Sequence, residues 1–248
     1  MDEKVSVIIP AYNAAGFIRE TVQSILEQTY TNFEIIICEN GSTDNTKEVL
    51  SSFEDSRIKV FFLDENLHAA GARNEGVKAA VGDYIAYIDA DDLWHKDKLE
   101  KQIAFMKEND AAFCFTGYEF GDADAKPLGK IVKVPLTLSY KKALRNTTIF
   151  TSTVCFDMRK FTKDEIMMPD IKSEDTALWW QILRKGTVAY GLDENLVIYR
   201  RPTHSLSSNK IEAVKRIWNL YRNWEKLNIL KSAFCFMGWA FRAVKRRV

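Results

Sequence analysis

Apolar runs that predict β-strands alternate with amphipathic runs that predict helices over about the first 110 residues of the chain. We expect strands over 5–10, 33–38, 58–63 and 84–88, and helices over 14–28, 69–81 and 97–108, with one more helix after residue 44. The strand runs are apolar throughout, which is typical of a parallel sheet covered on both faces. The alternation therefore predicts an α/β fold with a Rossmann-like, mostly parallel central sheet flanked by helices.

Four loops of this predicted sheet carry polar residues at the point where a strand ends. They are residues 11–13, 39–41, 66–74 and 89–92. Right-handed crossovers bring all strand-to-helix loops to the carboxyl edge of a parallel sheet. Ligands of open α/β sheets bind at that edge, so we expect the site there.

The strand run 84–88 ends directly in the acidic segment Asp89-Ala90-Asp91-Asp92. Three carboxylates so close together repel one another unless a cation or a ligand needs them. Oxygen ligands suit Mg²⁺ and Mn²⁺, which often bridge to substrate phosphates. The segment alone fits a second interpretation equally well, a solvated loop in which Asp92 caps the next helix.

A second acidic pair, Glu174-Asp175, opens a predicted helix far away in the sequence. A general base needs a carboxylate of its own, separate from those that hold a metal. Two acidic clusters therefore fit one metal-assisted transfer reaction. The alternative is that the pair only stabilises the dipole of its own helix.

Two basic segments could bind phosphate groups. Arg73 lies in Gly71-Ala72-Arg73-Asn74 at a predicted helix start, and Arg200 and His204 lie in the segment 199–207. Arg73 could instead form a structural salt bridge, and a lone histidine such as His204 is more often a surface or core residue than a ligand. The patterns GxxxxGK[ST] and GxGxxG are absent, which disfavours P-loop NTPases and dinucleotide-dependent dehydrogenases.

Beyond residue 111 the regular alternation stops. We expect strands over 112–120 and 151–158, a hairpin-like connection over 121–130 and a short helix over 140–146. The four cysteines follow no CxxC spacing, which argues against a zinc site or a disulfide framework. No linker separates two cores, so the sequence predicts one domain over 1–208 and a tail over 209–248.

The order of these motifs resembles glycosyltransferase family 2, whose members have the GT-A nucleotide-sugar fold. The resemblance covers about residues 4–208 and rests on segments 10–13, 39–44, 72–74, 89–92, 174–175 and 199–204. It implies an inverting enzyme that moves a sugar from a nucleoside-diphosphate sugar to a saccharide acceptor of a bacterial surface polymer. We expect a lipid-linked acceptor, by analogy with the family and because the tail is basic.

The resemblance also implies which residues bind the nucleotide: Pro10, Ala11, Tyr12, Glu39, Asn40, Arg73, Asp89, Ala90, Asp91 and Arg200. Tyr12 would stack on the base, and Arg73 would lie beside the base and diphosphate. The family commonly carries two aspartates where this chain has Glu39-Asn40. An asparagine amide can still accept a hydrogen bond from a uracil N–H, so a UDP-sugar is the expected donor.

The same resemblance implies the catalytic and metal-binding residues. Asp89 and Asp91 form a DxD motif that contacts the ribose and holds Mn²⁺ or Mg²⁺ on the diphosphate. The implied metal ligands are Asp91, Asp92 and His204, and Arg200 and His204 would close over the diphosphate. Asp175, beside Glu174, would deprotonate the acceptor hydroxyl.

The tail is basic, whereas the rest of the chain is acidic. Ten lysines and arginines and two acids lie after residue 209, against twenty-five basic and thirty-two acidic residues before it. Apolar residues recur there at helical spacing, and the apolar run 233–241 is too short to span a bilayer. We expect a basic amphipathic helix on an anionic membrane surface. The alternative is packing on the catalytic domain or on a second subunit of a homodimer.

The sequence predicts a location at the inner face of the cell membrane, as a cytoplasmic peripheral protein without a signal peptide. We expect no nucleic-acid partner. Two alternative functions are a nucleotide-sugar-binding protein without transferase activity and a nucleotidylyltransferase. The acids Asp91 and Asp175 argue against the first, and the lack of a glycine-rich basic loop over 11–16 argues against the second.

Overall fold

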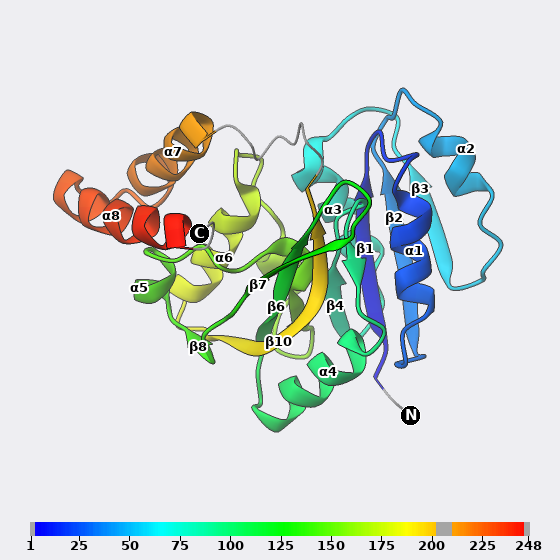
Figure 1. Cartoon of the computed structure of the whole chain (residues 1–248), viewed down its shortest axis with the longest axis horizontal. Coiled ribbons are helices and arrows are strands. Elements are labelled where there is room, and N and C mark those ends of the chain that lie inside the picture. Colours follow the sequence, from blue (N-terminus) through cyan, green and yellow to red (C-terminus); the bar gives the residue numbers. More distant parts are fainter. Residues whose placement is uncertain (1–2, 202–209, 246–248) are drawn as a thin grey trace.

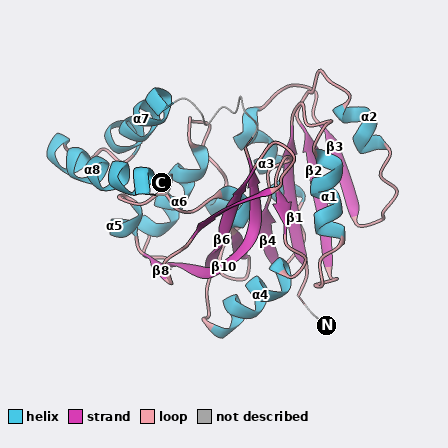
Figure 2. Cartoon of the chain, viewed as in Figure 1, coloured by secondary structure: helices cyan, strands magenta, loops and turns pink. Residues whose placement is uncertain are grey.

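The computed structural model describes residues 3–201 and 210–245, and these residues form a ten-stranded sheet with helices on both faces (Figures 1 and 2). The strand order along the main path is β3-β2-β1-β4-β9-β6-β10-β5, with β7 paired to β6 and β8 paired to β10. The predicted α/β fold is confirmed.

The amino-terminal half of the sheet is parallel, as predicted. It contains β1 (Val5–Ala11), β2 (Phe33–Glu39), β3 (Ile58–Phe62) and β4 (Tyr84–Tyr87), connected by α1 (Ile18–Leu26), α2 (Thr46–Ser51) and α3 (His68–Ala79). The strands β1, β2 and β4 are buried, but β3 lies at the sheet edge and exposes Phe61 and Phe62. The expectation that all four strands are covered on both faces is therefore wrong for β3.

The rest of the sheet is mixed. β6 (Phe113–Gly121) and β10 (Ala189–Arg200) are parallel, and β9 (Cys155–Asp157) runs antiparallel to both β4 and β6. Three short strands pair antiparallel: β5 (Leu93–Trp94) and β8 (Thr137–Leu138) with β10, and β7 (Pro127–Val132) with β6. The hairpin-like connection predicted after residue 120 is the β6–β7 hairpin. The strand predicted over 151–158 is shorter, because η1, a 3₁₀-helix (Thr151–Thr153), precedes β9.

Alternate strand residues build two cores, one on each face of the sheet. Val7 and Ile9 of β1 face α1 and α4 (Lys98–Glu108). Ile8 belongs to the opposite core with residues of α3 and α6 (Glu174–Arg184). The short α5 (Tyr140–Ala143) and the 3₁₀-helix η2 (Lys163–Ile166) also border this second core. The period of two along a strand explains the division.

The carboxyl-terminal helices pack on this second core, beyond α6 as seen from the parallel strands (Figure 1). They are α7 (Lys210–Asn219), a π-helical turn (Leu220–Trp224) and α8 (Ile229–Lys245). The ring of Tyr221 stacks on Trp180 of α6, with centroids 5.2 Å apart, and its hydroxyl donates to the Leu144 carbonyl. The predicted domain boundary at 208 lies outside the described residues. Within the described ranges, none of the helices is both long and apolar enough to cross a membrane.

Candidate active site

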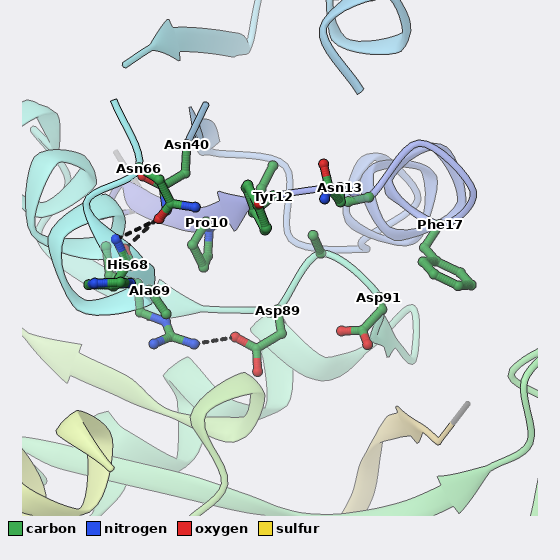
Figure 3. Close-up of a pocket in the computed structure, with 14 residues that line it drawn as sticks. Pro10, Tyr12, Asn13, Phe17, Asn40, Asn66, His68, Ala69, Asp89 and Asp91 are labelled. Atoms are coloured by element: carbon green, nitrogen blue, oxygen red, sulfur yellow. Dashed lines mark hydrogen bonds and ion pairs between the residues drawn. The ribbon is translucent and has the colours of Figure 1, made fainter. Parts of the chain in front are cut away.

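A pocket of about 500 Å³ opens at the carboxyl edge of the parallel strands (Figure 3). All four predicted loops contribute to it, which confirms that they converge. Eight of the residues predicted to bind the nucleotide line this pocket: Pro10, Ala11, Tyr12, Asn40, Arg73, Asp89, Ala90 and Asp91.

The sequence prediction missed several lining residues. Asn66, just before α3, and His68 and Ala69, at its start, fall within the predicted loop 66–74 but were not singled out as site residues, and Phe17 immediately precedes α1. Phe17 belongs to the helix predicted over 14–28, but its half-buried ring borders the pocket, and the Arg200 guanidinium lies 5.0 Å from the ring centre. An apolar residue at the start of a helix fits the helical period whether it packs in the core or borders a pocket, so the period could not reveal the position of Phe17.

Asn40 is held by the loop that leads into α3. Its side-chain amide donates to Asn66 Oδ1 at 3.1 Å and to the His68 carbonyl at 3.2 Å (Figure 3). Its Oδ1 accepts from the Leu67 N–H. An aspartate could not make the two donations. The amide of Asn40 therefore fixes the loop over 66–68.

Glu39 does not line the pocket. It is fully buried, accepts from the Ser42 N–H at 2.6 Å, and lies 3.8 Å from Lys47 Nζ. These contacts stabilise the turn after β2. Of the predicted Glu39-Asn40 pair, only Asn40 borders the space where a ligand could bind.

Arg73 joins the two acidic clusters. Its buried guanidinium donates to Asp89 Oδ1 at 2.6 Å and to Glu174 Oε1 at 2.9 Å. Glu174 lies 101 positions away in the sequence, so this bridge brings the first turn of α6 to the pocket. The structural salt-bridge interpretation of Arg73 is confirmed, and because these salt bridges lie on the pocket wall its phosphate role stays a prediction.

Asp91 lies on the same side of the pocket as Asp89 (Figure 3). Burial and the neighbouring Asp89 charge raise the pKa of Asp91 to about 6. A carboxylate in such surroundings is stabilised by an added positive charge.

Asp92 is fully buried and does not line the pocket. One of its oxygens accepts from the Ser152 hydroxyl and the other from the Arg200 backbone N–H at 3.1 Å. Burial, together with Asp91 and Asp89, raises the pKa of Asp92 well above its ordinary value. This placement argues against the predicted metal role. The helix-cap interpretation is also wrong, because β5 follows and Asp97 occupies the cap of α4.

Ser152 is a positioning residue that the sequence did not reveal. Its hydroxyl accepts from the Asp89 N–H at 3.0 Å, and its carbonyl accepts from the indole N–H of Trp94 at 2.8 Å. Lys98 Nζ lies 3.7 Å from the centre of the Trp94 ring. The acidic loop is therefore supported from beneath by η1 and α4.

Arg200 is committed to contacts within the protein. Its guanidinium donates to the Asp91 carbonyl at 2.7 Å, to the Ala123 carbonyl at 3.0 Å and to Glu20 at 2.5 Å. These bonds tie the end of β10 to the acidic loop, so Arg200 positions the loop in this state of the molecule. His204 lies outside the described residues.

The Glu174-Asp175 pair starts α6, as predicted, and follows a strained residue. Ser173 has left-handed backbone angles, with φ 64° and ψ 47°, which is unfavourable for a residue with a side chain. Asp175 accepts from the Thr151 hydroxyl at 3.3 Å and from the Thr176 N–H at 2.5 Å. Burial and the adjacent Glu174 raise the pKa of Asp175.

The pocket acids fit a divalent cation held jointly with a ligand. Among the described residues, no group of three or more histidine, cysteine, aspartate or glutamate side chains could hold a metal ion. Mg²⁺ and Mn²⁺ at diphosphates need only one or two carboxylates, with phosphate and water oxygens completing the shell. Asp91 and Asp89 supply such carboxylates at the pocket wall.

The family model described as "Glycosyl transferase family 2" matches residues 6–166, from the second residue of β1 to the end of η2. The chain belongs to glycosyl transferase family 2. TuaG of Bacillus subtilis, a glycosyltransferase assigned to teichuronic acid biosynthesis, is 45% identical over 247 residues, which cover 98% of this chain and 97% of TuaG. The family resemblance expected from the motifs is confirmed, and the chain is a glycosyltransferase.

Another relative in the family is WfgD of Escherichia coli, a UDP-Glc:α-D-GlcNAc-diphosphoundecaprenol β-1,3-glucosyltransferase. It is 37% identical over 247 residues, which cover 99% of this chain and 95% of WfgD.

Solved structures confirm the GT-A fold of this family 2 member. The mannosyltransferase PcManGT of Pyrobaculum calidifontis, in complex with GDP-Man and Mn²⁺, superposes with a TM-score of 0.73 at 19% identity, over 97% of this chain and 74% of PcManGT. TarS 1–349 of S. aureus, in complex with UDP-GlcNAc, gives 0.70 at 18% identity, over 96% of this chain and 71% of TarS.

Proposed function

We propose that this glycosyltransferase is inverting and moves a sugar from a UDP-sugar to a lipid-linked saccharide during synthesis of a cell-surface polysaccharide. The observation that carries the proposal is the bridge from Asp89 through Arg73 to Glu174. It holds a donor pocket with its own carboxylates beside a second, separate carboxylate, Asp175. A displacement reaction needs this division between leaving-group binding and proton removal.

The donor nucleotide would occupy the 500 Å³ pocket, which has the size typical of a nucleotide site. Tyr12, nearly half exposed at the pocket, would stack on the base. The neighbour TarS was solved with UDP-GlcNAc, and the name of WfgD specifies UDP-Glc, which supports uridine.

Asp91, assisted by Asp89, would hold Mn²⁺ or Mg²⁺ at the donor diphosphate. The neighbour PcManGT was solved with Mn²⁺, which supports a divalent cation. When bound, the cation would neutralise negative charge on the departing diphosphate. Arg73 would remain beside the diphosphate while it keeps Asp89 in place.

Asp175 would take the proton from the acceptor hydroxyl. The acceptor oxygen forms a bond to the anomeric carbon while the bond from that carbon to the diphosphate oxygen breaks, so the configuration inverts. A raised pKa makes the Asp175 carboxylate a stronger base. Glu174, which is paired with Arg73, would orient this pair rather than accept the proton.

A membrane location is supported by the outer face of α8. Leu230, Phe234, Met237 and Phe241 follow one another at helical spacing and are 54–81% exposed. On the other face of the helix, Ser232 and Cys235 are buried. An apolar stripe on a helix in a basic segment suits the interface of an anionic bilayer. We propose that this stripe places the enzyme on the inner face of the cell membrane.

A donor screen followed by a transfer assay tests the function. We expect UDP-sugars with Mn²⁺ to raise the melting temperature, because a ligand that binds only the native state stabilises it. Transfer to a diphospholipid-linked N-acetylglucosamine should then give a product, and NMR should show that the anomeric configuration of the new linkage is inverted relative to the donor. Donor binding without transfer to any saccharide would favour a binding protein, and a retained configuration would refute the displacement.

Vesicle flotation tests the stripe. The variant with Leu230, Phe234, Met237 and Phe241 all changed to serine should no longer float with phosphatidylglycerol vesicles. A matched control changes the exposed Leu128 and Ile131 of β7 to serine and should float like the wild type. If the wild type stays off the vesicles and the stripe variant converts a dimer to a monomer, the stripe is a subunit interface instead.

A further inference from the structure

A second cavity, of about 150 Å³, lies between α6 and the carboxyl-terminal helices. Its polar lining comes from Thr147, Ser173, Thr176, Arg216 and Trp239. Ser173 and Thr176 flank Glu174-Asp175 in the sequence, so the cavity adjoins the proposed base. It has room for about five water molecules, enough for phosphate oxygens but far too little for a nucleotide.

Arg216 of α7 is a cation without a carboxylate partner in the described parts of the chain. Its Nε donates to the Glu212 carbonyl one turn earlier, at 3.3 Å. The adjacent Lys215, by contrast, pairs with the Glu212 carboxylate at 3.4 Å. The guanidinium edge of Arg216 is therefore available to an anion in the cavity.

The hydroxyls and the helix end in this cavity also suit an anion. For the side chains of Ser173 and Thr176, residues 3–201 and 210–245 supply no hydrogen-bond partner. The left-handed Ser173 leaves the first turn of α6 without a side-chain cap. Backbone N–H groups at a helix start favour negative charge. Arg73 offsets part of the negative charge of Glu174, and Arg216 lines the cavity, so the anion would be placed beside Arg216.

We propose that this cavity binds the phosphate groups of an acceptor that is a sugar joined through a diphosphate to a lipid. The inference rests on the proposed function, because it places the acceptor hydroxyl at Asp175. In such an acceptor the first phosphate lies only one sugar ring away from the reacting hydroxyl. This short separation matches the protein, in which the cavity lies beside the proposed base. Trp239 in the cavity wall belongs to α8, whose outer stripe would meet the membrane that holds the lipid.

Two acceptor probes separate phosphate binding from sugar binding. One is N-acetylglucosamine with an α-diphosphate-linked undecyl chain, and the other is the undecyl glycoside of the same sugar. Their dissociation constants are measured by titration calorimetry with UDP present, for the wild type, Arg216→Ala and Arg216→Lys. Lys215→Ala is the matched control, since it removes a neighbouring charge outside the cavity.

We expect Arg216→Ala to weaken binding of the diphosphate probe about tenfold or more, the usual size of a charged hydrogen bond. Arg216→Lys should lose less affinity for the diphosphate probe than Arg216→Ala, and Lys215→Ala should bind this probe like the wild type. Affinities for the glycoside and for UDP should stay unchanged in all variants. Thr176→Val, which removes only the hydroxyl, should weaken the diphosphate probe by a smaller factor.

Equal affinity of the wild type for both probes, or equal loss for both in Arg216→Ala, would overturn the inference. Inorganic pyrophosphate serves as a third ligand in the titrations. If Arg216→Ala weakens binding of pyrophosphate but not of the diphosphate-linked sugar, the cavity binds a free anion and the inference is wrong. Failure of the proposed function looks different, since no UDP-sugar would then be transferred to either probe. Transfer to both probes without an Arg216 effect would keep the function and remove the inference.

Discussion

The acidic loop after β4 and the acidic turn at the start of α6 lie on either side of Arg73, but the protein holds them differently. The loop is fixed along its length: Thr21 donates to the Ala90 carbonyl at 2.9 Å, Ser152 bonds to Asp89 and Asp92, and Arg200 bonds to Asp91 and Asp92. The turn depends on Arg73, on Thr151 and on the strained Ser173. The comparison indicates that the proposed donor side is held more firmly than the proposed base.

Removing the base should have the largest effect on turnover. Asp175→Asn keeps the size of the side chain but cannot take a proton, so we expect kcat to fall by about 10²–10⁴-fold with donor affinity unchanged. Steady-state kinetics and UDP titration measure the two quantities. Glu174→Gln is the control, and its kcat should fall less than that of Asp175→Asn, because the neighbouring Asp175 remains. Turnover near the wild-type level in Asp175→Asn would refute the base assignment.

Asp91 tests the donor side of the comparison. Asp91→Asn should weaken donor binding in the presence of Mn²⁺ by about tenfold to a hundredfold, since it loses a charged ligand. With EDTA the wild type and the variant should bind the donor with similar affinity. A donor affinity that ignores both EDTA and the substitution would remove Asp91 from metal binding.

Arg73 tests the connection between the two acidic segments. Arg73→Met leaves Asp89 and Glu174 without their cation, and we expect the free energy of unfolding to fall by about 2 kcal/mol. Fully buried pairs lose more, but these carboxylates are 28% and 20% exposed and water screens them. Urea unfolding measures the loss. The double variant Arg73→Met with Glu174→Gln should recover part of it, and no recovery would mean that the pair contributes nothing.

Lys98, beneath the acidic loop, should affect stability and leave turnover nearly unchanged. Burial lowers the pKa of Lys98 to about 8 from 10.5. Between these values the unfolded chain binds more protons than the folded one, so the free energy of unfolding rises with pH. Below pH 8 the buried charge is a cost, partly offset by the Trp94 ring.

The measurement compares the wild type with Lys98→Met at two pH values. At pH 7 we expect the variant to be more stable by about 1 to 3 kcal/mol, and by pH 10 most of this advantage should be gone. Urea unfolding at both pH values gives the difference. An advantage that does not change with pH would show that Lys98 keeps its ordinary pKa in the folded protein.

The parts of the site that the sequence predicted are the parts encoded locally. Each polar loop directly follows its own apolar strand, so Tyr12, Asn40 and Asp91 could be placed at one edge from strand order alone. The family resemblance then gave Asp175 a role. The prediction that Asp175 is the base, and Asp91 a metal ligand, still awaits the experiments above.

The parts that the sequence did not predict depend on contacts between distant segments. Ser152 lies in a stretch that looks like a strand, and only the fold places its hydroxyl between Asp89 and Asp92. The local sequence pattern likewise did not indicate that the Arg200 guanidinium would pair with Glu20. The helical period of the tail was visible, but it could not tell which face packs on Trp180 and which remains exposed.

The stacking of Tyr221 on Trp180 has a consequence for which acceptors can react. It packs the carboxyl-terminal helices directly on α6, whose first turn carries Asp175. If the α8 stripe lies in the bilayer, the base then stands at a fixed height above the lipid headgroups. A saccharide of the matching length reaches it, whereas a chain one or two sugars longer would carry its end past the base, so chain length itself becomes a criterion of selection.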